Sequence, residues 1–232
     1  MISRGRSAGV LYIVSTPIGN LGDISPRAVE ILKSVDLIAS EDTRTCGRLL
    51  SHFDIETPQT SFHDHNEKSK APKLVEVLSE GRSVALISEA GTPLISDPGF
   101  NLVKLAVDSG VNVVPVPGPS SLLAALVASG FPTDRFCFEG YPPRTESKLR
   151  RFFEALAAES RTMIFFESPH RVKKCMNTML SVMGDRELLL ARELTKKFEE
   201  KIRGRISEVA EAVKERTLKG EIVLVVRGCK DV

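Results

Sequence analysis

A loop of twelve residues, Ser88–Gly99, with the sequence SEAGTPLISDPG, constrains the fold of this chain more than any other stretch. It joins a short apolar run, 82–87, to a segment at 100–107 whose apolar residues have helical spacing. A buried strand, a Gly/Pro-rich loop and a helix in this order are typical of the ligand site at the carboxyl end of a parallel sheet. Ordinary loops of this kind have roughly two to six residues. The length therefore favours a function over a plain turn, and we expect Gly91 and Gly99 to let a ligand approach the backbone closely.

Length and composition are those of a globular protein with one large or two small domains: 232 residues, 42% of them hydrophobic and 27% charged. No apolar run reaches the roughly 18 residues of a membrane span. The basic N-terminus has no apolar segment behind it that would indicate a secretory signal. The four cysteines are scattered and lack metal-ligand spacing, which predicts a reduced, cytoplasmic protein without a metal. A net charge of +2 does not by itself indicate nucleic-acid binding.

Predicted strands and helices alternate up to about residue 117, whereas strands become denser after it. The alternation predicts an α/β fold with a mostly parallel sheet, and the second pattern predicts a mixed sheet. We therefore expect two α/β domains, 1–117 and 118–232. The expected strands are 9–14, 37–39, 82–87, 111–116, 135–139, 162–166, 187–192, 197–203 and 221–226. The expected helices are one that begins after Ser25, and 43–52, 71–80, 100–107, 121–128, 146–157, 170–183 and 207–216.

Three Pro/Gly loops, around Pro17, Pro93 and Pro117, each follow a predicted strand. The carboxyl ends of parallel strands lie along one edge of a sheet, so these loops are expected to line one cleft. The usual nucleotide-binding loops are missing, because no strand is followed by G-x-G-x-x-G and no G-x-x-x-x-G-K-[ST] occurs. Both a dinucleotide dehydrogenase and a P-loop NTPase are therefore disfavoured.

Nine motifs in a fixed order carry a resemblance that covers residues 9–227. They are VSTPIGNLGDIS (14–25), ASEDTR (39–44), FHDHNE (62–67), SEAGTPLISDPG (88–99), VPGPSSLLAALVASG (116–130), FCFEGYPPR (136–144), ESPHR (167–171), RELTKKFEE (192–200) and KGEIVLVV (219–226). In this combination the chain resembles the tetrapyrrole methylase superfamily, in particular its members that methylate the ribose 2′-hydroxyl of a cytidine in 16S rRNA. The resemblance implies a homodimeric enzyme of two α/β domains, with S-adenosylmethionine (SAM) in the cleft between them and 16S rRNA or the 30S subunit as substrate.

The resemblance also implies the residues that contact SAM. The methionine end of the cofactor is expected near Ile18 and the loop 90–95, and the adenosine near Ser120, Ser121 and Phe166. These positions are small or apolar, and they offer backbone N–H and C=O groups together with a dry wall for adenine. The full expected set is Pro17, Ile18, Gly19, Ala90, Gly91, Thr92, Pro93, Ile95, Ser120, Ser121 and Phe166.

The chain departs from the family pattern at two points. Glu89 stands where an Asp is usual, which could change the affinity for the cofactor. Many members also continue into a small helical region that this sequence does not include, which leaves open any RNA contact made by such a region.

Two acids and an arginine follow the expected strand 37–39 and are the first candidates for catalysis. Asp42 is expected to act as a general base or to orient the hydroxyl, with Glu41 beside it and Arg44 holding a phosphate. The alternative for Asp42 is an N-cap of the helix that begins at Thr43. Glu167, in the ESPHR motif, is the reserve candidate.

Basic residues cluster in the second half and are expected to bind RNA phosphates, although solvated helix surfaces carry such charges routinely. Aromatic residues are few and Trp is absent, so the sequence does not favour a base-stacking platform. The spacing of His63 and His65 does not favour a metal site. The expected RNA-binding set is Arg44, Arg144, Lys148, Arg150, Arg151, His170, Arg171 and Lys173.

Two alternative functions remain open at this point. The first is methylation of a tetrapyrrole carbon, whose enzymes usually carry G-D-P in the central loop where this chain has GTP at 91–93. The second is a non-catalytic module that binds RNA or ribosomes and has kept the fold, which the presence of all three Pro/Gly loops disfavours.

Overall fold

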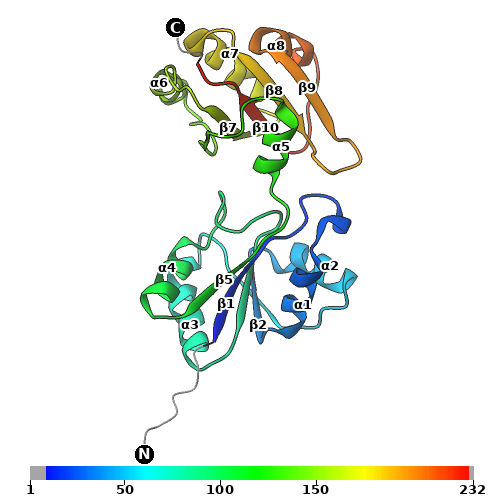
Figure 1. Cartoon of the computed structure of the whole chain (residues 1–232), viewed down its shortest axis with the longest axis vertical. Helices are drawn as coiled ribbons and strands as arrows, with labels where there is room; N and C mark the ends of the chain where they lie inside the picture. The colour runs from blue at the N-terminus through cyan, green and yellow to red at the C-terminus, as the bar shows by residue number, and fades with distance from the viewer. Residues whose placement is uncertain (1–8, 230–232) are drawn as a thin grey trace, which may run out of the picture. The chain divides into compact units, whose positions relative to one another are not determined.

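The computed structural model describes residues 9–229, and the chain divides after Ser120 into two compact units (Figure 1). Each unit has its own sheet and its own hydrophobic core. Within residues 9–229, no helix is long and apolar enough to cross a membrane.

The first unit is built on a five-stranded sheet in which every neighbouring pair is parallel. The strand order is β3-β2-β4-β1-β5. The central strand β4 is buried along its whole length, as expected for a strand covered on both faces. The strands are β1 (Val10–Val14), β2 (Leu37–Ser40), β3 (Gln59–Ser61), β4 (Val84–Ile87) and β5 (Asn112–Val116).

Helices cover both faces of this sheet. On one face, Leu32 of α1 and Leu50 of α2 pack in one core cluster, and on the other Leu78 of α3 and Leu102 of α4 pack in a second. The side chain of Ser25 caps α1 by accepting from the N–H of Ala28 at 3.1 Å. The helical elements are η1 (Leu21–Asp23), α1 (Pro26–Ser34), α2 (Thr43–His52), α3 (Glu67–Ser79) and α4 (Phe100–Asp108).

The strand order places a topological switch point at β1 and β4, which are neighbours in the sheet. From β1 the chain passes through α1 to β2, on the far side of β4, and from β4 it passes through α4 to β5, on the far side of β1. Right-handed crossovers in opposite directions put α1 and α4 on opposite faces. Ligands of open α/β sheets bind where two such connections diverge, so the loops 15–25 and 88–99 occupy the favoured position.

The second unit has a mixed sheet with the order β6-β7-β10-β8-β9. Only β6 and β7 run parallel, and the remaining neighbours are antiparallel. The strands are β6 (Phe136–Phe138), β7 (Thr162–Glu167), β8 (Glu187–Arg192), β9 (Glu200–Arg205) and β10 (Ile222–Val226).

One face of this mixed sheet is covered by three helices, whose residues Phe153, Met176 and Val209 share one core cluster with the strands. The first helix, α5, instead packs against β7, β8 and β10 and is not part of that cluster. The helices are α5 (Ser121–Ser129), α6 (Glu146–Ala155), α7 (Val172–Met183) and α8 (Ile206–Val213).

The expected fold class is confirmed, with a parallel sheet in the first unit and a mixed sheet in the second. Strand β3 was not expected. Its three residues are polar and half-buried, because it is an edge strand paired only with β2, so no apolar run marks it. Strand β9 begins at Glu200, because 193–199 forms a loop after β8.

Candidate functional site

Two of the three Pro/Gly loops are joined directly at the switch point. Thr16 and Gly91 exchange two backbone hydrogen bonds, of 2.8 and 3.0 Å, as an isolated antiparallel bridge. Ile18 lies next to this bridge, since a Cβ built on Gly91 would be 3.3 Å from its side chain. The structure therefore brings together two residues of the expected cofactor set that are more than seventy positions apart in the sequence.

Thr92 ties the third loop to the other two. Its hydroxyl lies 3.0 Å from the hydroxyl of Ser15 and 3.2 Å from the carbonyl oxygen of Pro119, to which it donates. Gly118, in the third loop, also packs against the first loop, because a Cβ built on Gly118 would lie 3.0 Å from the Cβ of Ser15. All three Pro/Gly loops thus meet at one edge of the parallel sheet.

The loop 88–99 is held in a strained conformation. Leu94 and Ser96 have φ of 72° and 65°, although neither is glycine. Gly99 has φ of 136°, and a Cβ there would lie 2.7 Å from Leu86. The two loop glycines therefore allow close approach of the chain to itself, and the ligand approach expected from the sequence stays a prediction. Backbone strain of this kind is concentrated at ligand sites and costs of the order of 1–3 kcal/mol per residue.

Glu67 fixes the far end of this loop, a role that the sequence did not indicate. Its buried carboxylate accepts from the backbone N–H groups of Gly99 and Asn101, each at 3.0 Å. These N–H groups lie at the N-terminus of α4, on its N-cap Gly99 and in its first turn, where backbone N–H groups lack partners within the helix. The residue that caps them comes from another helix, so local sequence patterns could not identify it.

Asp42 caps α2, which was the alternative to a catalytic role, and it also pairs with Arg44. Its Oδ1 accepts from the N–H of Arg44 at 2.8 Å, and its Oδ2 lies 3.0 Å from the Arg44 guanidinium. These contacts lower the pKa of Asp42 to about 2, so the group is a weak base. The Arg44 side chain is 90% exposed and has free donors to offer a phosphate. The catalytic role of this pair stays a prediction.

Asp97, an acidic residue at the same sheet edge, was missed by the sequence reasoning, which had named Glu41 as a candidate. Burial raises the pKa of Asp97 to about 6, assisted by the charges of Glu89 and Asp64 and opposed by a hydrogen bond from Ser88. Burial also raises the pKa of Glu41, with the charges of Asp97 and Glu89 adding to it. A carboxylate whose pKa is about 6, as that of Asp97 is, is suited to accept a proton near neutral pH. Among residues 9–229, no set of three or more His, Cys, Asp or Glu could hold a metal ion.

Phe166 lies within an aromatic cluster of the second unit. Its ring centroid is 4.8 Å from that of Phe138 and 5.6 Å from that of Tyr141. Both neighbours meet the Phe166 ring edge to face, and because Phe166 is half-buried and Tyr141 is exposed, part of this aromatic surface is accessible. An accessible aromatic surface suits an apolar ring system such as adenine.

The residues of the expected cofactor set in and around the three loops differ in their exposure to solvent. Pro17, Ile18, Gly91 and Pro93 are buried, whereas Gly19, Ala90 and Ile95 are exposed. Thr92, Ser120 and Ser121 are half-buried. The contacts of all these residues with the cofactor stay predictions.

Glu167 and Arg171 form an internal pair. Glu167 is buried, its carboxylate lies 3.3 Å from the guanidinium of Arg171, and burial raises its pKa. Arg171 also donates to the carbonyl oxygens of Pro142 and Pro143 at 2.6 and 3.1 Å. These internal contacts stabilise the second unit. The expected contacts of Glu167 and Arg171 with the substrate stay predictions.

The other expected RNA-binding residues of the second unit lie on or just before α6 and α7, two helices that pack together. Arg150 is 56% exposed and pairs with Glu154 at 3.2 Å, whereas the Nζ of Lys173 donates to the carbonyl oxygen of Lys214. Four more are exposed on the same helices or the loops before them: Arg144, Lys148, Arg151 and His170.

The parallel sheet with its joined loops and the mixed sheet that follows it in the chain define a two-unit α/β protein whose joined loops lie at a switch point. The family model described as tetrapyrrole (corrin/porphyrin) methylases matches residues 10–210. The chain belongs to the tetrapyrrole methylase family.

Relatives at about half identity share one name. The chain is 52% identical over 231 residues to "Ribosomal RNA small subunit methyltransferase I" of Vibrio cholerae, covering 97% of this chain and 80% of that protein. It is 49% identical over 231 residues to the protein of that name from Escherichia coli O157:H7, covering 98% and 81%. A relative from Streptococcus pyogenes, with the same name, is 49% identical over 225 residues, covering 97% and 78%.

Solved structures agree on the fold. A cobalt precorrin-4 methyltransferase has a TM-score of 0.68 at 17% identity, covering 98% of both chains. A uroporphyrin-III C-methyltransferase from Thermus thermophilus has a TM-score of 0.67 at 18% identity, covering 94% of both chains. At this level of identity the likeness concerns the fold and not the substrate.

Proposed function

We propose that this chain is a SAM-dependent methyltransferase that modifies the ribose 2′-hydroxyl of a cytidine in 16S rRNA. The observation that carries the proposal is the identity of about one half, over nearly the whole chain, to proteins named for methylation of small-subunit ribosomal RNA. The joined Pro/Gly loops at the switch point support it, because they keep the ligand site of the fold in place.

The cofactor contacts are proposed residue by residue. Ile18 and the exposed part of the loop 90–95 hold the amino-acid end, using backbone groups fixed by the Thr16–Gly91 bridge. Ser120, Ser121 and the Phe166 surface take the adenosine. When bound, SAM supplies an electrophilic sulfonium methyl group.

The task left to the protein is to position the 2′-hydroxyl and remove its proton. Correct positioning alone is worth roughly 7–11 kcal/mol of the barrier. Asp97, with Glu41 near it, is the proposed proton acceptor, because its pKa of about 6 leaves it ionised at neutral pH and able to accept. Arg44 holds a substrate phosphate, and Asp42 fixes the orientation of Arg44 through their ion pair.

The exposed basic residues of α6 and α7 are the proposed RNA surface. Arg150 and Arg151 represent it best, because Arg171 is committed to internal contacts. Each phosphate that such a residue neutralises contributes to affinity and to its dependence on salt.

The proposal also covers the oligomeric state of the protein and its location in the cell. We propose a homodimer, supported by α5, which buries Leu122 and Leu126 but leaves Leu123 and Val127 exposed by 48% and 75%. A cytoplasmic location is proposed because ribosomal RNA is the substrate. Light scattering at micromolar protein would contradict the dimer if it gave the mass of one chain.

The test of the proposed function is transfer of a labelled methyl group from SAM. We expect label in 30S subunits or 16S rRNA, and resistance of the modified linkage to alkaline cleavage, because a 2′-O-methyl group removes the attacking hydroxyl. Label in a tetrapyrrole and none in RNA would contradict the proposal in favour of carbon methylation. Failure to bind SAM in calorimetry would favour a non-catalytic binding module.

A further inference from the structure

The loop 193–199, which connects β8 to β9, has an unusual backbone. Glu193 and Thr195 have φ of 52° and 66°, in the left-handed region that residues other than glycine rarely adopt. Two successive turns follow, with the N–H of Lys196 donating to the carbonyl of Glu193 and the N–H of Glu199 donating to that of Lys196. Strained residues persist only where the surroundings hold them, and they are concentrated at functional sites.

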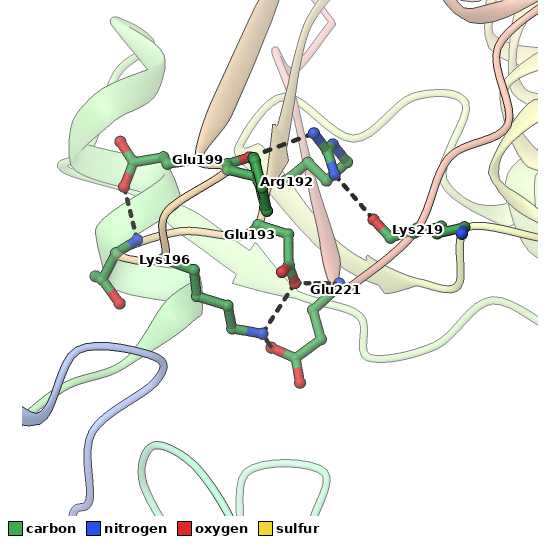
Figure 2. A network of polar contacts seen from close by, with 8 residues as sticks. Arg192, Glu193, Lys196, Glu199, Lys219 and Glu221 are labelled. Carbon is green, nitrogen blue, oxygen red and sulfur yellow. Dashed lines mark hydrogen bonds and ion pairs between the residues drawn. The ribbon is translucent and has the colours of Figure 1, made fainter.

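A network of charged groups holds this loop in place, as Figure 2 shows. The Glu193 carboxylate accepts from the Nζ of Lys196 at 2.9 Å and from the N–H of Glu221 at 3.0 Å. The ammonium of Lys196 also reaches the Glu221 carboxylate at 3.0 Å. On the other side of the loop, the Glu199 carboxylate accepts from the N–H of Thr195 at 2.6 Å.

The base of the loop is tied to the sheet in the same way. Arg192 pairs with Glu200 at 3.1 Å. It also donates to the carbonyl oxygen of Lys219 at 3.1 Å (Figure 2). Arg216 pairs with the same Glu200 at 2.8 Å, and the side chain of Leu194 is buried. The loop is therefore anchored at both ends and across its middle. Because its backbone is already fixed, it loses little conformational entropy when the residues at its tip bind a ligand.

The tip of the anchored loop presents Lys197 and Phe198. Phe198 is 66% exposed, and the Nζ of Lys197 lies 5.7 Å from the centroid of its ring. Within the described segment 192–201, Lys197 is the one basic residue without a carboxylate partner. A bare aromatic ring and an unneutralised ammonium thus stand side by side on a rigid support.

We propose that this tip is an RNA contact, in which the ring of Phe198 stacks on an unpaired base of the substrate and Lys197 binds an adjacent phosphate. The inference rests on the proposed function, since it requires an RNA substrate. Unpaired bases are commonly bound by aromatic stacking beside basic groups. A protein partner fits less well, because the residues on either side of Phe198 in the chain are the exposed charged residues Lys197 and Glu199.

A fluorescence experiment tests the contact directly. Because the sequence has no Trp, Phe198→Trp introduces a single tryptophan at the tip. Titration with a short single-stranded RNA oligonucleotide is expected to quench its emission, as stacked bases do. Val107→Trp is the matched control, since Val107 is 59% exposed near the C-terminal end of α4, and its emission is expected to stay unchanged. Equal quenching of the two variants, or none in either, would overturn the proposal.

Steady-state kinetics on 30S subunits gives the second test. Phe198→Ala is expected to raise the KM for the subunit roughly 5- to 150-fold, the range for loss of one stacked base, with kcat and SAM affinity retained. Phe198→Tyr keeps a stacking ring and is expected to retain the wild-type KM. A wild-type KM in Phe198→Ala would overturn the inference while the proposed function stands.

The two proposals fail in different ways. The fluorescence titration needs no methyl transfer, so it reports on the RNA contact even if the wild-type protein methylates no RNA. A change of oligomeric mass in Phe198→Ala, with RNA binding unchanged, would overturn the RNA contact and assign the tip to an interface with a second copy of the chain.

Discussion

The carboxylate of Glu67, at the start of α3, accepts a hydrogen bond of 3.0 Å from the backbone N–H of Gly99, which precedes α4. Residues 32 positions apart are thereby joined inside the first unit. The bond closes the strained loop 88–99 at the end opposite to the Thr16–Gly91 bridge. The loop that dominates the sequence is therefore held at both ends by contacts that are distant in sequence.

Replacement of Glu67 tests the importance of this cap. Glu67→Ala leaves the N–H groups of Gly99 and Asn101 without their acceptor, and should lower the free energy of unfolding of the first unit by about 1–3 kcal/mol per buried group. Glu67→Gln keeps one acceptor oxygen and should lose less. Urea unfolding measures both, with Glu76→Ala, an exposed site on the same helix, as control. Equal stability of all three variants would contradict the assigned cap.

Asp97 should link the methylation rate to pH. Its pKa of about 6 means that the ionised, proton-accepting form is lost as the pH falls below about 6, so the single-turnover rate should fall there. Asp97→Asn should lower the rate by roughly 10²–10⁴-fold and remove this inflection. Asp134→Asn, at an exposed site, should leave both unchanged. An unchanged profile in Asp97→Asn would exclude it as the base.

The same carboxyl group should affect stability with the opposite sign. A folded pKa raised above the ordinary value near 3.9 means that Asp97 favours the fold below about pH 4, and that this contribution is lost as the pH rises to about 6. Asp97→Asn should therefore raise the melting temperature at pH 8 and give no gain at pH 4. Thermal unfolding at the two pH values measures this, and a loss of stability at pH 8 would contradict the assignment.

Asp42→Asn separates orientation from proton transfer. Because the pKa of Asp42 is about 2, the loss of its charge should lower the rate by a similar factor at every pH from 5 to 9. The expected factor is roughly 10–100, the value of a hydrogen bond to a charged group. Arg44→Ala should raise the KM for RNA. A larger loss with a displaced pH inflection would make Asp42 the base, and a wild-type rate would leave it as a helix cap.

The basic surface of the second unit should determine the salt dependence of RNA binding. Arg150→Ala with Arg151→Ala should weaken binding and flatten the log–log salt plot by about one unit for each phosphate that the protein no longer neutralises. Arg171→Ala should instead destabilise the second unit, since it removes the partner of the buried Glu167. Filter binding at several salt concentrations and thermal unfolding distinguish the two effects. A wild-type slope in the double variant would identify a solvated helix surface.

Thr92 should affect SAM affinity through the arrangement of the loops. Thr92→Val removes the hydroxyl that contacts Ser15 and Pro119, with a loss of about 1 kcal/mol, which corresponds to roughly fivefold in affinity. Thr57→Val is a matched control, because its hydroxyl also donates to a carbonyl of the first unit, that of Leu32. Calorimetric titration with SAM measures both. Equal affinities would show that the junction of the loops does not set cofactor binding.

Much of the fold was determined by local sequence. Ser25 and Pro26 marked the start of α1, Thr43–His52 was predicted with both its ends, and β8 was predicted with both its ends. The reason is that capping residues and apolar periodicity act on neighbouring positions and need no knowledge of the rest of the chain. The three Pro/Gly loops were visible for the same reason, since glycine and proline act on their own backbone.

The contacts, exposure and pKa values of individual residues, by contrast, were decided only by the tertiary structure. Burial and the charges of Glu89 and Asp64 raise the pKa of Asp97. Phe198 is exposed at the tip of a loop that is held in place by ion pairs with distant segments. Arg171, which looks like a surface cation in the sequence, is turned inward by Glu167 and two proline carbonyls. Burial and electrostatic coupling arise from residues far apart in the chain, so their effects exist only once the chain has folded.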